Sequence, residues 1–372
     1  MPQPPSPETG ALLTIDLGAV CDNWRSLKAR VGGADCAAVV KADAYGLGAA
    51  QVGPALADAG CGHFFVAHLA EGLALRPLLP TGATVFVLHG APPGAEADCA
   101  AAGLVPVLNS AQQVQAWRTL AARRGRRLPA VVQVDSGMSR LGLSGAELDQ
   151  LAADADSFAG IEVRCVMSHL ACADEPDHPA NAMQRERFIA ARRRLPAAPA
   201  SFANSSGIFL GPGYHFELAR PGAALYGVAP VAGAPNPMRP VVRLQAKVMQ
   251  LRQVEAGTPV GYGFSWRAPA AARIATVSVG YADGWQRSQS HRGAAWFEGV
   301  ELPLVGKVSM DTITLDASAL PEGALQPGAL VDLIDARRGV DGVAARAGTI
   351  GYEVLTSLGR RYERHYVHGA AA

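Results

Sequence analysis

Short apolar runs alternate with longer helical stretches over roughly the first two thirds of the chain. Between about residues 14 and 230, each run is followed by an Ala- and Leu-rich stretch with helical spacing. The runs are almost continuously apolar, as expected for strands that are buried on both faces. We therefore predict parallel strands at 37–41, 63–67, 85–89, 105–108, 131–135, 163–169, 201–204 and a short one ending near Arg220.

Eight β-α units of this kind predict an α/β fold, a (β/α)8 TIM-type barrel. The alternative is an open, doubly wound sheet. That alternative is disfavoured because no Gly-x-Gly-x-x-Gly motif follows the first strand.

The pattern changes near residue 231. Pro and Gly dominate residues 229–237, and Val-rich segments separated by turns replace the helical spacing afterwards. We predict a second, mainly β domain with strands at 241–254, 273–279, 302–308 and 330–334 and one helix over 349–362. The expected organisation is an N-terminal segment 1–13 associated with the C-terminal domain, a barrel 14–230 and a β-domain 231–372.

Charge and composition point to a small-molecule partner. The 33 Lys and Arg residues against 32 Asp and Glu give a net charge of +1. No overall field would attract nucleic acid or an acidic membrane, and no apolar stretch is long enough to span a bilayer. We expect neither a nucleic-acid nor a membrane partner.

The cysteines and the N-terminus suggest a cytoplasmic protein. The six cysteines are far apart and form no Cys-x-x-Cys pair, so we expect reduced thiols, no disulfides and no metal site. Residues 1–10 contain four prolines and no basic residue, unlike a signal peptide.

Lys41 ends the first predicted strand, within the decapeptide 37–46. Active sites of TIM-type barrels lie at the carboxyl ends of the strands. Desolvation at such a place lowers the pKa of an ammonium group and makes the amine a usable Schiff-base nucleophile. The alternative is a surface lysine that ends a strand.

The decapeptide resembles the cofactor-lysine signature of alanine racemases. Further matches to that family follow in its order over nearly the whole chain, at 135–142, 168–169, 203–205, 220–227, 261–263, 280–284, 310–311 and 351–353. The resemblance implies pyridoxal 5'-phosphate as cofactor and the interconversion of L-alanine and D-alanine. It also implies a homodimer with composite active sites. Two physiological roles stay open, D-alanine biosynthesis for peptidoglycan and the catabolism of D-alanine.

The resemblance assigns the cofactor-binding residues. Lys41 would hold the cofactor covalently, and the phosphate group and its surroundings would be contacted by Tyr45, Asn204, Ser205, Gly222, Ala223 and Tyr352. Hydroxyl groups and backbone amides suit a dianion.

Two further residues would face the cofactor ring. Arg220 would lie at the pyridine nitrogen, where an arginine can only donate a hydrogen bond. The ring nitrogen then stays unprotonated, which weakens the ring as an electron sink and limits side reactions such as transamination. His169 would lie against the ring and orient it rather than transfer protons.

Racemisation requires an acid/base group on each face of the substrate α-carbon. The resemblance assigns Lys41 to one face and Tyr262 of the partner subunit to the other. A phenol with a pKa of about 10 is a poor base at neutral pH. A nearby cation must favour its ionised form, or a relay must carry its proton away. The same partner would supply Tyr281, Met310 and Asp311, which narrow the entrance and bind the substrate carboxylate.

The chain departs from the family near the substrate carboxylate, which Arg140 would align. Many family members carry a carbamylated lysine seven residues earlier, but Gln133 stands here and cannot be carbamylated. Either the Gln133 carbonyl accepts a hydrogen bond from Arg140, or a small anion such as chloride occupies the space. Activity should then be independent of bicarbonate. Leu47 stands where the family usually has histidine, a minor departure.

Three other functions compete with alanine racemisation. A broad-specificity amino-acid racemase would differ only around the substrate side chain. A non-catalytic cofactor-binding barrel would end after the barrel, which the predicted second domain argues against. A basic amino-acid decarboxylase would need a cysteine in the second domain, and none occurs after Cys172.

Overall fold

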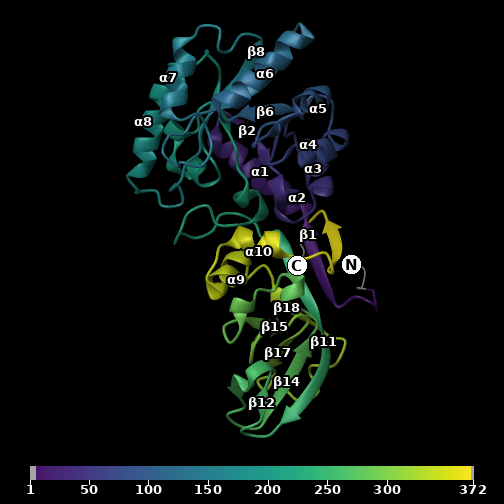
Figure 1. Ribbon diagram of the computed structural model, residues 1–372. Helices are drawn as coiled ribbons and strands as arrows, with labels where there is room; N and C mark the ends of the chain where they lie inside the picture. Colours follow the sequence, from purple (N-terminus) through teal and green to yellow (C-terminus); the bar gives the residue numbers. More distant parts are fainter. Residues whose placement is uncertain (1–5, 370–372) are drawn as a thin grey trace. The chain divides into compact units, whose positions relative to one another are not determined.

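The computed structural model describes residues 6–369 and forms two compact units (Figure 1). The barrel unit comprises residues 20–225 and 229–238. The β unit comprises the remaining described residues, 6–19, 226–228 and 239–369. It is therefore assembled from both ends of the chain.

A curved parallel sheet of seven strands, hydrogen-bonded in chain order, forms the centre of the barrel unit. The strands are β3 (Ala38–Val39), β4 (His63–Val66), β5 (Thr84–Val87), β6 (Val105–Leu108), β7 (Leu128–Gln133), β8 (Ile161–Met167) and β9 (Ala200–Ser201). These strands begin within two residues of their predicted positions, except β7, which begins earlier than predicted. A separate two-residue strand, β2 (Asp35–Cys36), precedes β3.

An eighth strand, β10 (Leu218–Ala219), connects the two edges of this sheet. It pairs in parallel with β2, directly before β3. On its other side, the N–H groups of Glu217 and Arg220 donate to the carbonyls of Ala200 and Ala203, at 3.0 and 2.8 Å. The predicted TIM-type barrel is therefore confirmed.

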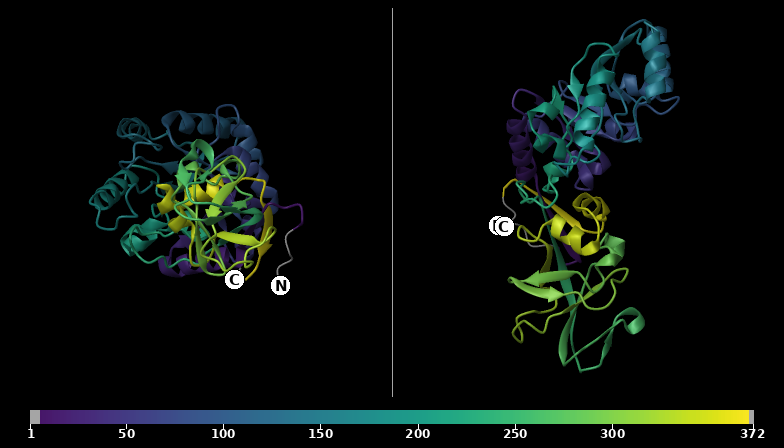
Figure 2. Two further views of the ribbon diagram at one scale, coloured as in Figure 1. Left: turned by 90° about the horizontal axis from the view of Figure 1, so that it is seen from below. Right: turned by 90° about the vertical axis from the view of Figure 1, so that its left-hand side faces the viewer.

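Helices pack outside the strands of the barrel unit, as Figure 1 and the two further views of Figure 2 show. They are α1 (Leu17–Val31), whose first residues belong to the β unit, α3 (Ala49–Asp58), α4 (Leu69–Leu75), α5 (Glu96–Ala101), α6 (Ala111–Arg124), α7 (Gly145–Ala153) and α8 (Ala180–Arg192). The short element α2 (Lys41–Tyr45) is instead a left-handed turn directly after β3. Inside, a cluster of buried strand residues fills the barrel, with Phe65 and Phe86 stacked at 4.5 Å between ring centroids. The barrel is a packed core, so chemistry is restricted to its ends.

The β unit is built around one long strand, β11 (Val242–Val254). It pairs antiparallel with β1 (Ala11–Asp16), β14 (Ala272–Val277) and β18 (Leu330–Ile334), and β1 pairs in parallel with β19 (Glu363–Val367). The sheet is completed by β15 (Ala294–Phe297), β16 (Val300–Pro303) and β17 (Ile313–Asp316), and β12 (Pro259–Val260) with β13 (Trp266–Arg267) forms a small hairpin. The mainly β character predicted for the second part of the chain is confirmed.

The C-terminal helix differs from the prediction. The structure has two short helices, α9 (Val340–Ala347) and α10 (Gly351–Ser357), in place of one helix over 349–362. Gly348 ends α9 with a left-handed φ of 72°, a common helix C-terminus that glycine adopts without strain. The chain is extended again at Leu358, shortly before β19.

The described part of the predicted N-terminal segment runs along the sheet of the β unit, because β1 begins at Ala11. Residues 1–5 of that segment lie outside the described residues. The functional boundaries 14–230 and 231–372 stay a prediction. Within residues 6–369, none of the helices combines the length and apolar character needed to cross a membrane.

Candidate active site

Lys41 opens a left-handed turn at the carboxyl end of β3. The four residues after it, 42–45, have φ values of 52°, 54°, 53° and 56°, although none is a glycine. Left-handed backbone costs a residue with a Cβ roughly 1–2 kcal/mol. A short hydrogen bond within the turn, from Gly46 N–H to the Ala42 carbonyl at 2.7 Å, offsets only part of this cost. Neighbouring structure must hold the turn.

The surroundings of Lys41 favour its neutral amine. Burial lowers the pKa of the Lys41 ammonium, and the guanidinium of Arg140 lowers this pKa further, whereas the Glu71 carboxylate opposes the shift. A neutral amine is the form that attacks a carbonyl carbon to make a Schiff base. The prediction that Lys41 is a usable nucleophile agrees with this electrostatic environment.

A cradle of hydrogen-bonding groups lies near the turn. Ser205 Oγ accepts the N–H groups of Gly222 and Ala224 at 2.9 and 3.1 Å. A Cβ at Gly222 would lie 3.1 Å from Tyr45 Cζ and closer still to the phenol oxygen. Only glycine therefore lets Tyr45 approach the 222–224 backbone. Ala223 begins the short helix η4 (Ala223–Tyr226).

Asn204 uses its side chain within the same region. Its Oδ1 accepts the Gly207 N–H at 2.8 Å, and its Nδ2 donates to the Leu170 carbonyl at 3.4 Å. These bonds fix the loop that carries Ser205. Asn204 therefore lies beside the cradle and shapes it through the backbone.

Arg220 follows β10 and is only 3% exposed. Its Nη2 donates to the Ser168 carbonyl at 2.6 Å, and its Nη1 donates to Ser201 Oγ. Burial lowers the pKa of Arg220 to about 10, so the guanidinium stays charged at neutral pH. The barrel thus holds a fixed cation at the end of its last strand.

His169 lies next to this cation, two residues after β8. Burial is the main cause that lowers the pKa of His169 to about 3, and the charges of Arg220, Arg140 and Lys41 add to it. The imidazole is therefore neutral over the physiological range. This supports an orienting role rather than that of a cationic proton donor.

A buried polar network supports the end of β8. Ser168 Oγ donates to the Val134 carbonyl at 2.8 Å and lies 2.7 Å from Ser136 Oγ. Gln184 on α8 donates to the His169 carbonyl at 3.0 Å. Sequence reasoning missed Gln184 and the Arg220 partner Ser201, because a single polar residue in an apolar stretch carries no distinctive spacing.

Arg140 lies on the rim of a cavity of about 360 Å³ in the barrel unit. The cavity is lined by His89, Asn109, Ser110, Gln113, Asp135, Ser139, Arg140, Leu141 and Gly142. Gln133 is buried below it, and its Nε2 donates to the Leu141 carbonyl at 3.2 Å. The Gln133 side chain is therefore anchored to the residue directly after Arg140.

Two loops of the β unit bring Tyr281, Met310 and Asp311 together. The Tyr281 N–H donates to the Ser309 carbonyl, and the Ala282 N–H donates to the Met310 carbonyl, both at 3.0 Å. Within one unit, these loops thus act as a single rigid surface.

Arg361 ties the same two loops together through their carboxylates. It donates to both oxygens of the buried Asp283, at 2.6 and 2.9 Å, and to Asp311 Oδ1 at 2.7 Å. Sequence reasoning missed Arg361. The only available signal was its place in a basic pair, Arg360 and Arg361, shortly before the last strand.

Tyr262 begins the short helix η5 (Tyr262–Phe264) of the β unit. Its side chain is 69% exposed, and those of Met310 and Tyr281 are 53% and 45% exposed. A Cβ at Gly263 would lie 3.3 Å from Lys307 Nζ, so an ammonium group lies beside this turn. Tyr352, in the first turn of α10, is also exposed.

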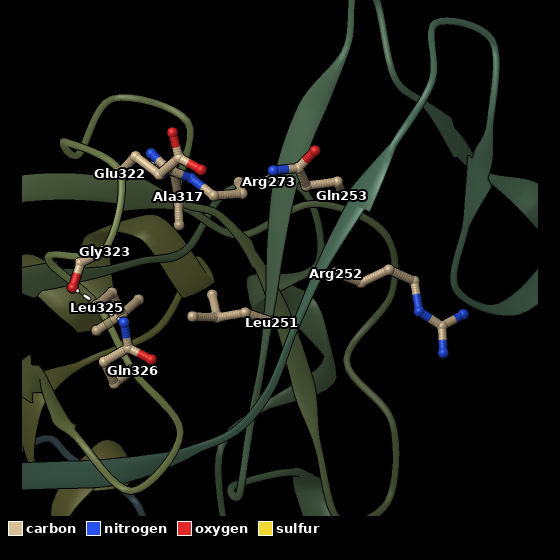
Figure 3. A pocket seen from close by; sticks show the side chains of 9 residues that line it. All are labelled: Leu251, Arg252, Gln253, Arg273, Ala317, Glu322, Gly323, Leu325 and Gln326. Carbon is tan, nitrogen blue, oxygen red and sulfur yellow. Dashed lines mark hydrogen bonds between the residues drawn. The ribbon is translucent and has the colours of Figure 1, made fainter.

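A second cavity, of about 230 Å³, lies in the β unit between β11, β14 and the 317–326 loop (Figure 3). It contains none of the predicted site residues. Its central cation, Arg273, already donates to the carbonyls of Ala317, Leu320 and Pro321. This cavity therefore carries no candidate chemistry.

A barrel that combines a strand-end lysine of lowered pKa with an amide-lined cradle has the architecture of a pyridoxal-phosphate enzyme. Family models make the assignment specific. Residues 15–230 match the alanine racemase N-terminal domain, and residues 241–366 match the alanine racemase C-terminal domain. The chain belongs to the alanine racemase family.

Individual relatives are similar over nearly the full chain. The catabolic alanine racemase of Mesorhizobium japonicum is 60% identical over 97% of this chain and 94% of its own length. The alanine racemase of Rhodospirillum rubrum is 53% identical over 96% of both chains. The crystal structure of the Bartonella henselae alanine racemase, with covalently bound pyridoxal phosphate, superposes with a TM-score of 0.94. It is 43% identical and covers 96% of this chain and all of that one.

Proposed function

We propose that this protein interconverts L-alanine and D-alanine with pyridoxal phosphate bound covalently at Lys41. The observation that carries the proposal is the placement of Lys41, with its lowered pKa, in a turn that also brings Tyr45 to the Ser205–Gly222 cradle. The names of the relatives and the cofactor in the Bartonella henselae enzyme support it.

The residues of the barrel unit fit the cofactor. The Ser205 hydroxyl, the Tyr45 phenol and the backbone amides of Gly222 and Ala223 would receive the phosphate. The Gly222 amide, which donates to Ser205 Oγ, would then exchange this acceptor for a phosphate oxygen. Arg220 would donate to the pyridine nitrogen and keep it unprotonated, and neutral His169 would support the ring. When bound, pyridoxal phosphate acidifies the α-hydrogen of the amino acid by drawing electron density from the α-carbon.

Proton transfer would use one group on each face of the substrate. Lys41 Nζ would remove or deliver the proton on one face, and the phenol of Tyr262 of the partner subunit would do so on the other. A phenol serves as a base only where its ionised form is favoured.

The exposed residues of the β unit favour a homodimer with composite sites. Tyr262, Tyr281 and Met310 are large hydrophobic residues that are 69%, 45% and 53% exposed within the single chain. Arg361 holds the loops of Tyr281 and Met310 together through Asp283 and Asp311, as a surface that fits into another molecule requires. In the dimer, these side chains would enter the barrel mouth of the partner subunit.

Substrate binding would also be shared between subunits. Arg140, which lines the cavity of the barrel unit, would hold the alanine carboxylate. Asp311 and Met310 of the partner subunit would limit the space for the substrate side chain, and Tyr352 would contact the cofactor phosphate. We further propose that the protein acts in the cytoplasm, where its six cysteines would stay reduced.

The test uses purified holoenzyme in deuterated water with L-alanine as the substrate. We expect loss of optical rotation together with deuterium uptake at Cα, and we expect both to vanish in Lys41→Ala, in which borohydride traps no cofactor. Turnover of serine or a basic amino acid without alanine would favour the broad-specificity racemase. Cofactor binding without any exchange would contradict the catalytic role of Tyr262.

A further inference from the structure

Glu71 links the Lys41 turn to the neighbouring β-α unit of the barrel. It is the third residue of α4, and its carboxylate accepts three backbone N–H groups. Oε1 accepts from Ala42 at 2.7 Å, and Oε2 accepts from Ala67 at 2.7 Å and from His68 at 3.0 Å. One carboxylate thus joins the end of β4 and the start of α4 to the residue that follows Lys41.

The bond to Ala42 bears directly on Lys41. The Ala42 N–H belongs to the peptide unit of the Lys41 carbonyl, and this unit is planar. Fixing the N–H therefore fixes the plane on the carboxyl side of the lysine α-carbon. Ala42 is also the first left-handed residue of the turn, with φ 52° and ψ 48°. The carboxylate holds the chain where the backbone departs from its ordinary conformation.

Only a carboxylate suits this position. Its two oxygens accept hydrogen bonds and donate none, so both ends of the side chain can face N–H groups. A glutamine would place its own NH₂ group against Ala42 or against the 67–68 amides. An aspartate would keep the charge but is one methylene too short to reach both sides.

Glu147 provides a matched comparison within the same barrel. It is the third residue of α7, and its Oε2 accepts from the Ser144 N–H at 3.0 Å. Its Oε1 accepts from the Ala111 N–H, at the start of α6, at 2.9 Å. It therefore caps its own helix and bridges to another β-α unit as Glu71 does, but it makes no contact with the Lys41 turn.

We propose that Glu71 is a positioning residue for Lys41, which holds the left-handed turn so that the lysine amine stays in place for covalent attachment of the cofactor. The inference rests on the proposed role of Lys41 as the cofactor lysine. It assigns no proton transfer to Glu71. What Glu71 contributes is the orientation of the Lys41 backbone.

The experiment compares Glu71→Gln, Glu71→Asp and Glu147→Gln with the unaltered holoenzyme. Cofactor attachment is measured by dialysis against known pyridoxal phosphate concentrations, followed by borohydride reduction and peptide mass spectrometry at Lys41. Thermal unfolding of each protein is recorded in parallel. We expect roughly tenfold or greater weakening of attachment in both Glu71 variants, because charge-assisted hydrogen bonds are lost. Glu147→Gln should attach the cofactor normally, with a comparable loss of thermal stability.

The outcomes separate this inference from the proposed function. If the unaltered protein is not modified at Lys41, the proposed function fails. If it is modified, but the Glu71 variants attach the cofactor as well as Glu147→Gln does, the positioning role is wrong. Full attachment in Glu71→Asp but not in Glu71→Gln would also overturn it, because charge alone would then suffice.

Discussion

The two units hold their predicted site residues in opposite ways. In the barrel unit, Arg220 is almost fully buried and donates to Ser168 and Ser201, and Ser205 accepts two backbone amides. In the β unit, Tyr262 and Met310 lie on short turns with most of their side chains exposed.

This difference separates two kinds of contribution to a site. The barrel residues are fixed by their own chain, so they are organised before any ligand arrives and contribute to stability as well. Tyr262 and Met310 expose most of their surface, so replacing them should alter function and leave folding intact. The exposure of Tyr262 and Met310 supports the proposal that the β unit presents these side chains to a second copy of this chain.

At Tyr262 we expect the largest difference between the effect of a substitution on activity and its effect on stability. Tyr262→Phe removes one hydroxyl from an exposed side chain, so the free energy of unfolding should change by no more than about 0.5 kcal/mol. Loss of an acid/base group should lower kcat by roughly 10²–10⁴-fold. Racemisation assays and thermal unfolding check both values. A marked loss of stability would break the contrast between the units.

A substitution at Arg220, unlike one at Tyr262, should lower the stability of the fold as well as change the cofactor site. Arg220→Met leaves the Ser168 carbonyl and Ser201 hydroxyl without their buried partner, and we expect a loss of about 2–4 kcal/mol in unfolding free energy. Cofactor absorbance should change at the same time, because the group at the pyridine nitrogen is replaced. Denaturant unfolding of the apoprotein measures the first effect. Unchanged stability would mean that the hydrogen bonds of Arg220 to Ser168 and Ser201 do not stabilise this end of the barrel.

A smaller effect, on the binding of pyridoxal phosphate, is expected from a substitution at Ser205 in the cradle. Ser205→Ala removes the acceptor for the Gly222 and Ala224 amides and a hydroxyl proposed to bind phosphate. We expect about tenfold weaker binding of pyridoxal phosphate, which corresponds to about 1.4 kcal/mol. Fluorescence titration of the apoprotein provides the measurement. Ser144→Ala, which removes a helix cap on α7, is the matched serine control and should bind the cofactor normally.

No effect at all is expected from bicarbonate. Gln133 cannot be carbamylated, and its side-chain amide is anchored to the Leu141 carbonyl next to Arg140. Activity in buffers stripped of carbon dioxide should therefore equal that with added bicarbonate. A requirement for bicarbonate would refute this account of Gln133. A requirement for chloride would favour an anion beside Arg140.

The sequence predicted those features that depend on local pattern. The alternation of apolar runs and helices predicted the barrel, and continuous motifs are the basis on which Lys41, Ser205 and Gly222 are proposed as site residues. Features that arise from tertiary contact were not predictable. Glu71 lies 29 positions from Ala42, and Arg361 lies 50 from Asp311, so no spacing connects either pair.

The backbone conformation of the turn after Lys41 was also not predictable from the sequence. The left-handed turn over 42–45 consists of Ala, Asp, Ala and Tyr, none of which signals positive φ as glycine does. The predicted helix over 349–362 failed for a related reason. The chain forms one short helix, α9, that ends at Gly348, and a second one, α10, after it, whereas the prediction contained a single helix and did not include α9.

Subunit complementation tests the central claim most directly. Lys41→Ala and Tyr262→Phe homodimers should each be nearly inactive. After the two are mixed and allowed to exchange subunits, each hybrid dimer should contain one site with both Lys41 and Tyr262. Random exchange should restore roughly a quarter of the unaltered activity. If hybrids form, as shown by mass spectrometry, yet no activity returns, the two residues do not meet across subunits and the composite site is wrong.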